Sequence, residues 1–351
     1  MSKKGGRRGH LTKSLYSHSQ NIQETFQMLD KPASSSLDKV DWPDVVKLGD
    51  EVSKQATIAG MLWNGEPREV KELEENMEAY FNMLQGFLLT CHGSTVNAGP
   101  TLHERIHSSA KQVVDSSLSL LKEAVSIYDS GEPSKRLIIP QLAGSVWEAC
   151  TALKKTPTTN CTAIVRAITL VAVSVKDVLR EMKELKTESN TDVNDQEEEM
   201  DDALSDDGLG DDLSAEEMII AQLVINVTYT SLNALKEVIQ FLSGLLKNPN
   251  VELDKKDSVD LLERLLGYCK EIGSQVSELG ACVYPPQEIS DMKMIAKKIA
   301  HGVGEIRGDV ERIESSNEKL FVAFQALETA LGKLDGLDGD LEFEMHRLAL
   351  K

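Results

Sequence analysis

Apolar residues recur at every third or fourth position over most of the 351-residue chain, and this spacing restricts the possible folds more than any other feature. Residues spaced in this way lie on one face of an α-helix. Clusters that contain glycine, proline or asparagine separate one such segment from the next. Because each apolar face must be buried against a neighbouring helix, the sequence predicts an all-α protein built from helical bundles.

Five amphipathic segments predict an N-terminal helical bundle over residues 37–188. The first begins after Asp41, a predicted N-cap, and stops at residues 64–67. The second ends near Gly93, the third runs from about 101 to 128, the fourth from about 141 to 155, and the fifth carries its stripe over 164–182. Short loops between these segments favour neighbours that pack side by side.

The acidic residues concentrate in one segment that interrupts the helical pattern. Residues 192–217 contain thirteen Asp or Glu and no Lys or Arg, which accounts for −13 of the net charge of −19. A segment of one charge with few large apolar residues cannot offset the entropy lost on ordering. We therefore predict an acidic, disordered linker over residues 189–214.

Three serines in or beside this linker are candidates for phosphorylation by a kinase that prefers acidic sites. They are Ser189, Ser205 and Ser214. Ser214 also opens the pattern Ser-Ala-Glu-Glu before an apolar run, which is typical of a helix capping box. For Ser214 we favour the capping role, and Ser189 and Ser205 stay open as regulatory sites.

The second half predicts a C-terminal helical bundle over residues 215–334, followed by a tail over 335–351. A corner at Tyr284-Pro285-Pro286 separates its helices. Beyond it, a heptad pattern from Val303 to Leu334 resembles a leucine zipper with one polar core position, Asn317. Alanine, glycine and phenylalanine beside the seam widen the apolar face, so we favour a bundle helix in a monomer over a zipper dimer.

Residues 1–36 are predicted to form a basic, flexible N-terminal segment with one short helix over residues 14–30. Residues 1–23 carry five Lys or Arg and no Asp or Glu. A plain tail, a nuclear-import signal and an organellar presequence are all consistent with this composition. We favour the plain tail, because short basic clusters are weak signals.

Charge and composition restrict the class of partner. The net charge of −19 opposes tight binding to nucleic acid, which needs clustered lysines and arginines, so proteins are the expected partners. The five cysteines include no C-x-x-C pair and read as reduced thiols inside a cell. No stretch approaches the roughly 18 apolar residues of a membrane span, so we expect no membrane association.

Residues 103–107 read His-Glu-Arg-Ile-His, a match to the H-E-x-x-H motif of zinc hydrolases. Two histidines four residues apart share one helix face and can hold zinc, while the glutamate activates its water. A third ligand is needed, and Glu123 lies on the same predicted helix, about 24 Å beyond His107 at 1.5 Å per residue. We favour surface or capping roles for His103 and His107 over catalysis.

No other catalytic motif is apparent, such as a glycine-rich phosphate loop or a G-x-S-x-G elbow. We therefore expect a protein that is not an enzyme and has no catalytic residues, metal or cofactor. A zinc hydrolase remains the enzymatic alternative.

Three short stretches resemble the cyclin-D-binding protein family, also called the cyclin-D-interacting proteins. They are Ser145-Val-Trp-Glu-Ala-Cys150, Val175-Lys-Asp-Val178 before the acidic insert, and Val283-Tyr-Pro-Pro286. The similarity extends over about residues 40–330 in order and spacing.

This resemblance implies two bundles akin to those of talin and vinculin, and a location in both nucleus and cytoplasm. It also implies a regulator that binds D-type cyclins or helix-loop-helix transcription factors and restrains the cell cycle. A talin-like or vinculin-like cytoskeletal scaffold is the alternative. The resemblance supplies no contact residues, and we expect Trp147 and Tyr284 to be core anchors.

Overall fold

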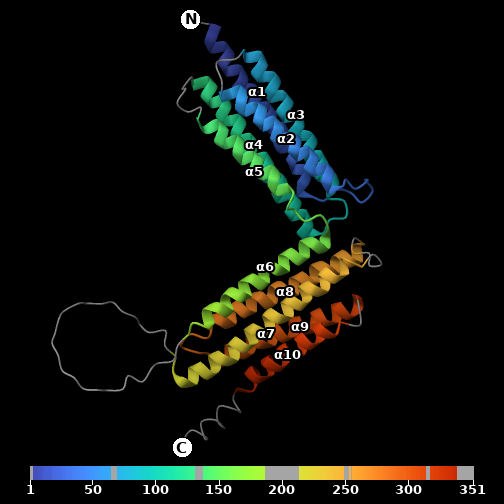
Figure 1. The fold of residues 1–351 in the computed structure, drawn as a ribbon, viewed down its shortest axis with the longest axis vertical. Coiled ribbons are helices and arrows are strands. Elements are labelled where there is room, and N and C mark those ends of the chain that lie inside the picture. The colour runs from blue at the N-terminus through green and yellow to red at the C-terminus, as the bar shows by residue number, and fades with distance from the viewer. Residues whose placement is uncertain are drawn as a thin grey trace, which may run out of the picture. The chain divides into compact units, whose positions relative to one another are not determined.

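The computed structural model describes residues 3–64, 69–130, 137–185, 213–248, 253, 255–313 and 317–337. Within these residues, all regular secondary structure is helical, as the apolar spacing predicts (Figure 1). The elements, in chain order, are α1 (Lys3–Phe26), the 3₁₀-helix η1 (Gln27–Asp30), α2 (Trp42–Asn64), α3 (Val70–Ser94), α4 (Pro100–Ser130), α5 (Ile138–Leu153), α6 (Asn160–Met182), α7 (Ala215–Leu245), α8 (Lys256–Ala281), α9 (Ile289–Ile313) and α10 (Glu318–Asp335).

The chain divides into two compact units. The first consists of Met1–Ala163 with Glu252–Asp260, and the second of Ile164–Val251 with Leu261–Lys351. Two helical bundles are thus confirmed, but the division differs from the predicted one, because α6 belongs to the second unit from Ile164 onward. Residues 186–212, which hold most of the predicted acidic linker, and residues 338–351 of the predicted tail lie outside the described residues.

The first unit has a continuous core. The helix α2 packs against α3 and α5, and α4 packs against α5. Tyr80 is fully buried, and its hydroxyl donates a hydrogen bond of 3.1 Å to Ser117 Oγ. Two buried tryptophans are also paired, since the Trp42 indole donates to the Leu153 carbonyl and the Trp63 indole to Asn76 Oδ1, each at 3.1 Å.

The N-terminal segment is helical and packed, which corrects the prediction of a flexible segment with one short helix. The helix α1 starts at Lys3 and lies against α3 and α4. Leu11, Leu15 and Ile22 are buried at this contact. Their spacing of four and seven residues is helical, and the helix predicted over residues 14–30 is present as part of α1 and η1. The basic composition of the residues before it led us to treat them as flexible.

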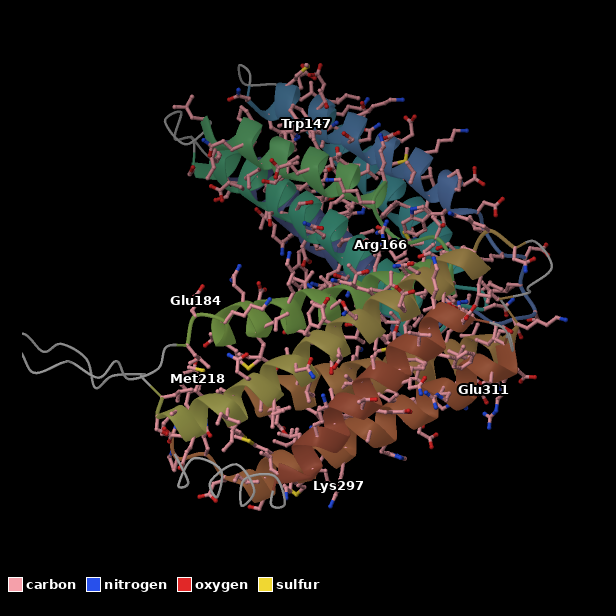
Figure 2. The ribbon with its side chains drawn as sticks, turned by 60° about the horizontal axis from the view of Figure 1, so that its bottom comes forward. Trp147, Arg166, Glu184, Met218, Lys297 and Glu311 are labelled. Atoms are coloured by element: carbon pink, nitrogen blue, oxygen red, sulfur yellow. The ribbon has the colours of Figure 1, made fainter. Side chains whose placement is uncertain are left out.

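The second unit contains a close contact between α6 and α8. A Cβ atom at Gly280 would lie 2.7 Å from Val178 Cγ1, and one at Gly273 would overlap Val171. The two glycines are seven residues apart, so they share a helix face and let the valine-rich face of α6 approach. The helix α10 packs against α7 and α9, while charged side chains such as Lys297 and Glu311 of α9 point outward (Figure 2).

One buried carboxylate links α8 to α9. The side chain of Asp309 is 4% exposed and accepts hydrogen bonds from Arg264 Nε at 2.8 Å and Nη2 at 2.6 Å. Arg312 Nη1 adds a third, at 3.2 Å. Bidentate pairing of this kind offsets the cost of burying the charge.

The heptad pattern does not form one zipper helix. The helix α9 ends at Ile313, and α10 begins at Glu318 with Asn317 as its N-cap, whose Oδ1 accepts from the Leu320 N–H at 3.2 Å. Asn317 is therefore a capping residue and not a polar core position. The apolar heptad residues are buried within the unit, as expected for a bundle helix; they include Val303, Ile306, Val310, Leu320, Phe324, Leu327, Leu331 and Leu334.

Among the described helices, α7 is long and apolar enough to cross a membrane by length and composition, which the sequence reading did not anticipate. The mean hydropathy of its most apolar window is 1.4, and 56% of that window is buried within the protein. The helix packs against α10, and this contact buries part of its apolar surface within the second unit.

Candidate protein-binding surface

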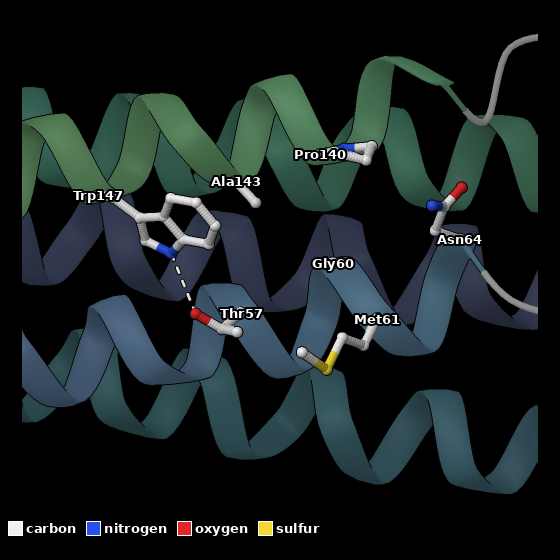
Figure 3. Close-up of a pocket in the computed structure, with 7 residues that line it drawn as sticks. All are labelled: Thr57, Gly60, Met61, Asn64, Pro140, Ala143 and Trp147. Carbon is white, nitrogen blue, oxygen red and sulfur yellow. Dashed lines mark hydrogen bonds between the residues drawn. The ribbon is translucent and has the colours of Figure 1, made fainter.

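A groove of about 350 Å³ lies between α2 and α5 on the first unit (Figure 3). It is lined by Thr57, Gly60, Met61, Asn64, Pro140, Ala143 and Trp147. The two helices approach closely at its floor, where a Cβ atom on Gly60 would lie 3.3 Å from that of Ala143. Small residues thus form the floor, and Trp147 and Met61 stand above it (Figure 3).

Trp147 is exposed to 44% but is fixed in orientation. Its indole Nε1 donates a hydrogen bond of 3.0 Å to Thr57 Oγ1 (Figure 3). The Thr57 hydroxyl in turn donates to the Ser53 carbonyl at 3.0 Å. Because a hydroxyl can donate and accept at once, this chain holds the indole against α2 while part of the ring faces solvent.

Two further apolar side chains are exposed on the α2 side of the groove. Met61 is 71% exposed, and Ile58, one helical turn before it, is also exposed. Adjacent exposed apolar residues on a protein surface are typical of a binding site. The polar side chains that line the groove are neutral, so it is suited to bind an apolar side chain of a partner by shape.

The chain matches two family domains in succession. Residues 44–188 match the N-terminal domain described as Grap2 and cyclin-D-interacting, and residues 193–308 match the C-terminal domain of the same description. Together the two matches cover most of the chain. This protein belongs to the Grap2 and cyclin-D-interacting family.

Over the residues that align, relatives in this family are about a quarter identical to the chain. The Cyclin-D1-binding protein 1 homolog of Xenopus laevis is 23% identical over 251 residues, which cover 71% of this chain and 72% of that protein. The human Cyclin-D1-binding protein 1 is 26% identical over 252 residues, which cover 67% of this chain and 66% of that protein. The family that the three short stretches predict is therefore confirmed.

The groove lies wholly within the N-terminal family domain, because all its lining residues fall between 44 and 188. The helix α1, in contrast, precedes the matched residues. The surface around Trp147 is thus part of the family's own module, and α1 packs onto that module from outside it.

The predicted core anchors are not core residues. Trp147 forms the exposed wall of the groove, and Tyr284 is only partly buried, with its hydroxyl 3.4 Å from Glu181 Oε1. At that corner the fully buried side chain is Val283. The indole N–H of Trp147 and the hydroxyl of Tyr284 both form hydrogen bonds near the surface. The large size of these rings suggested burial, but their polar atoms favour a partly exposed position.

Of the three candidate phosphorylation sites, the structure describes only Ser214. Its Oγ accepts from the Glu217 N–H at 3.2 Å, and the Glu217 side chain accepts from the Ser214 N–H at 2.9 Å. The predicted capping box is therefore confirmed. The bond from the Ser214 N–H lowers the pKa of Glu217, and a hydrogen bond from the Ser214 side chain to the carboxylate adds to this, because both favour the ionised form. Ser189 and Ser205 lie outside the described residues.

The histidines of the H-E-x-x-H sequence face the N-terminal helix. His107 Nε2 lies 3.5 Å from Asp30 Oδ1, and its ring is 4.8 Å from that of Phe26. Burial lowers the pKa of His103, and the neighbouring His107 adds to this, although a hydrogen bond with the Leu29 backbone opposes it. The two rings are 6.4 Å apart, and within the described part of the chain no three His, Cys, Asp or Glu side chains gather as a metal site would require.

Sequence reasoning missed the residues of the groove, although one signal was present. The buried stripe of α2 runs through Val45, Val52 and Ala59 at helical spacing, and Ile58 and Met61 fall outside it. Apolar residues off the buried stripe indicate an exposed patch. The role of Thr57 carried no such signal, because it depends on the approach of Trp147 from another helix.

Proposed function

We propose that this protein is a non-enzymatic regulator of the cell cycle and of transcription that acts by binding other proteins, with a D-type cyclin as its partner. Family membership supports this role, because the family is named for interaction with Grap2 and cyclin D. We assign the partner to the groove between α2 and α5. The observation that carries the assignment is an exposed tryptophan, Trp147, held in one orientation by Thr57.

An oriented, exposed tryptophan is a favourable anchor for a partner. Most of the binding energy of an interface comes from a few residues, among which tryptophan is enriched. Since the Trp147 ring is already fixed, binding costs less side-chain entropy than it would for a free ring. A partner side chain that enters the groove would displace water from the floor at Gly60 and contact the flexible Met61.

A regulator of this kind acts by occupying a surface of its partner. We propose that binding holds the cyclin away from its other partners and so restrains entry into the cell cycle. We also propose that the protein resides in both nucleus and cytoplasm. Imaging of the tagged full chain tests the location, and confinement to another compartment would contradict it.

The binding proposal is tested with the purified full chain and a purified D-type cyclin by titration calorimetry. Trp147→Ala should raise the Kd at least about tenfold, as expected for the loss of an interface anchor. Thr57→Val should have a smaller effect in the same direction, because the indole remains but loses its hydrogen-bond acceptor. Tyr229→Ala is the control, since Tyr229 is exposed to 49% on α7 of the second unit and should leave the Kd unchanged.

Two results would contradict the proposal in different ways. If Trp147→Ala keeps its helical circular dichroism and binds as the wild type does, the groove is not the binding site. If the wild-type chain binds no D-type cyclin at high micromolar concentrations, the partner is wrong.

A further inference from the structure

A narrow stripe of side chains holds α1 and η1 in the first unit. Leu11, Leu15, Ile22 and Leu29 are its buried apolar residues. The helix α3, of similar length, buries twice as many; they are Leu73, Met77, Tyr80, Phe81, Leu84, Phe87, Leu88 and Cys91. Since buried apolar area is the main stabilising contribution to helix packing, α1 is held less firmly than its neighbours.

Two side chains in this contact have a buried polar atom that finds no partner among the described residues. Ser19 of α1 is 8% exposed, and its Oγ is buried with no hydrogen bond. At the η1 end of the contact, His103 of α4 has a hydrogen bond with the Leu29 backbone, but its Nε2 is buried without a partner. Between these points, His18 stacks on Phe81 of α3 at 5.0 Å between ring centroids. A buried polar atom that loses water and gains no hydrogen bond weakens the contact.

Apart from that hydrogen bond of His103, three polar contacts of α1 and η1 with α3 and α4 lie at the surface. His10 Nδ1 is 2.6 Å from Glu74 Oε1 of α3, and Thr12 donates to Asp129 of α4 at 2.6 Å. The contact of His107 with Asp30 is similarly accessible to solvent. Water competes for such exposed pairs, so they align α1 without fixing it strongly.

Departure of α1 would uncover a groove rather than dismantle the bundle. The helices α3 and α4 each contact α1 more than they contact each other. The contacts of α2 with α3 and α5, and of α4 with α5, do not involve α1, and the matched family domain begins only at residue 44. The uncovered face would include Phe81 and the apolar surroundings of Ile22.

The segment that follows η1 is anchored independently of α1. The Ala33 N–H donates to Thr95 Oγ1 at 2.8 Å, and the Val40 N–H donates to the Gly93 carbonyl at 3.2 Å. Both acceptors lie at the end of α3. A released α1 would therefore stay tethered beside its groove and compete there at high local concentration.

We propose that the groove between α3 and α4 is a second helix-binding surface, which α1 covers and can vacate for a basic amphipathic helix of another protein. The apolar face of the partner helix should match that of α1 and η1. It should carry aliphatic residues at the positions of Leu11, Leu15, Ile22 and Leu29. An apolar residue at the position of Ser19 would bind better than the serine, because it leaves no unpaired hydroxyl.

The rims of the groove define the charge of that partner. Glu74 of α3 and Asp129 of α4 face the first half of α1. Lysine or arginine residues opposite these carboxylates would steer and orient the incoming helix. This inference concerns a face distinct from the Trp147 groove and does not depend on the cyclin assignment.

Hydrogen exchange on the full wild-type chain tests whether α1 opens by itself. We expect the amides of α1 to exchange at least about a hundredfold faster than those of α3 and α4, as for a separate unit of low stability. Ser19→Ala should slow the exchange of α1, because it removes the unpaired hydroxyl. Protection of α1 equal to that of α3, or no slowing in Ser19→Ala, would overturn the proposal.

A labelled synthetic peptide of residues 9–30 tests whether the groove accepts a helix from solution. In the full chain, Leu15→Asp should release α1 from the groove. This variant should then bind the peptide at least about tenfold more tightly than the wild-type chain, whose groove is covered. Tyr16→Asp is the matched control, since Tyr16 is 65% exposed on the outer face of α1 and should behave as the wild type does.

Each failure of this experiment has a definite meaning. A Leu15→Asp chain that keeps its helical content but does not bind the peptide would overturn the helix-binding groove. A Leu15→Asp chain in which α2–α5 lose their hydrogen-exchange protection would show that α1 is an integral part of the bundle, which also overturns the proposal. A peptide with Ser19→Ala should bind more tightly than the unmodified peptide, and weaker binding would contradict the stated preference.

Discussion

Buried polar side chains in the first unit differ in whether they find a hydrogen-bond partner. Tyr80 lies fully buried against Ser117, whereas His103 keeps one ring nitrogen without a partner. Burial raises the pKa of Tyr80 well above its usual range, because the charged phenolate would lose its hydration. Burial likewise lowers the pKa of His103, since it disfavours the imidazolium. The two shifts have the same cause and opposite signs.

His103 makes the stability of the first unit depend on pH. Its pKa in the folded protein lies below the value of 6.5 expected for the unfolded chain. The unfolded state therefore binds more protons as the pH falls through 6.5, and the free energy of unfolding decreases. The histidine contributes no such loss at pH values well above 6.5, where it is neutral in both states.

We predict that His103→Gln flattens the pH dependence of unfolding of the first unit between about pH 7.5 and 5.5. Urea unfolding at several pH values measures this. His301→Gln, at an exposed position of α9, serves as the control. An unchanged slope in His103→Gln would show that other groups determine the acid sensitivity.

The sequence predicts individual core positions well but not the roles of polar or aromatic residues that contact a distant helix. Helical spacing places Ile106 and Val113 on a buried face, and both are buried. Trp147 has the size of a core residue, yet its position depends on Thr57, ninety residues earlier. Asn317 fits a heptad, yet its side chain caps the start of α10.

At the scale of the element, α6 and α8 pack closely because small residues lie at their contact. Gly273 and Gly280 of α8 receive Val171 and Val178 of α6. This contact explains why the predicted N-terminal bundle of residues 37–188 differs from the observed unit. The apolar stripe of α6 predicts that one face of this helix is buried, but it does not predict which helices cover that face. In the first unit, α1 and not α6 packs beside α3 and α4.

Substitution of Gly280 by alanine should destabilise the second unit by about 1–3 kcal/mol, because the added methyl group overlaps Val178. Gly304→Ala is the matched control in α9, where no atom lies within 4 Å of the added methyl group. It should stabilise the unit by about 0.5–1 kcal/mol through helix propensity. Chemical denaturation measures both, and a stabilising Gly280→Ala would contradict the close contact.

At the scale of the whole molecule, the two units have separate cores. Tyr80→Phe should cost about 1 kcal/mol by removing the hydrogen bond to Ser117. Asp309→Asn should cost about 2 kcal/mol, reduced from the value for a fully buried pair because Arg264 is partly exposed.

The location of each effect tests the division into units. Hydrogen exchange should show faster exchange in α3 and α4 for Tyr80→Phe, and in α8 and α9 for Asp309→Asn. In the double variant the two effects should add, because the sites share no partner. Loss of protection in both units from either single substitution would contradict separate cores.

The hydrogen bond between Trp147 and Thr57 has an optical consequence. The chain has three tryptophans, and Trp42 and Trp63 are buried in the first unit, each with a hydrogen-bonded indole. Trp147 is the one that solvent and quenchers such as acrylamide can reach. Quenchable, red-shifted fluorescence therefore comes mainly from this ring, and its shift to shorter wavelength would report occupancy of the groove without any added label.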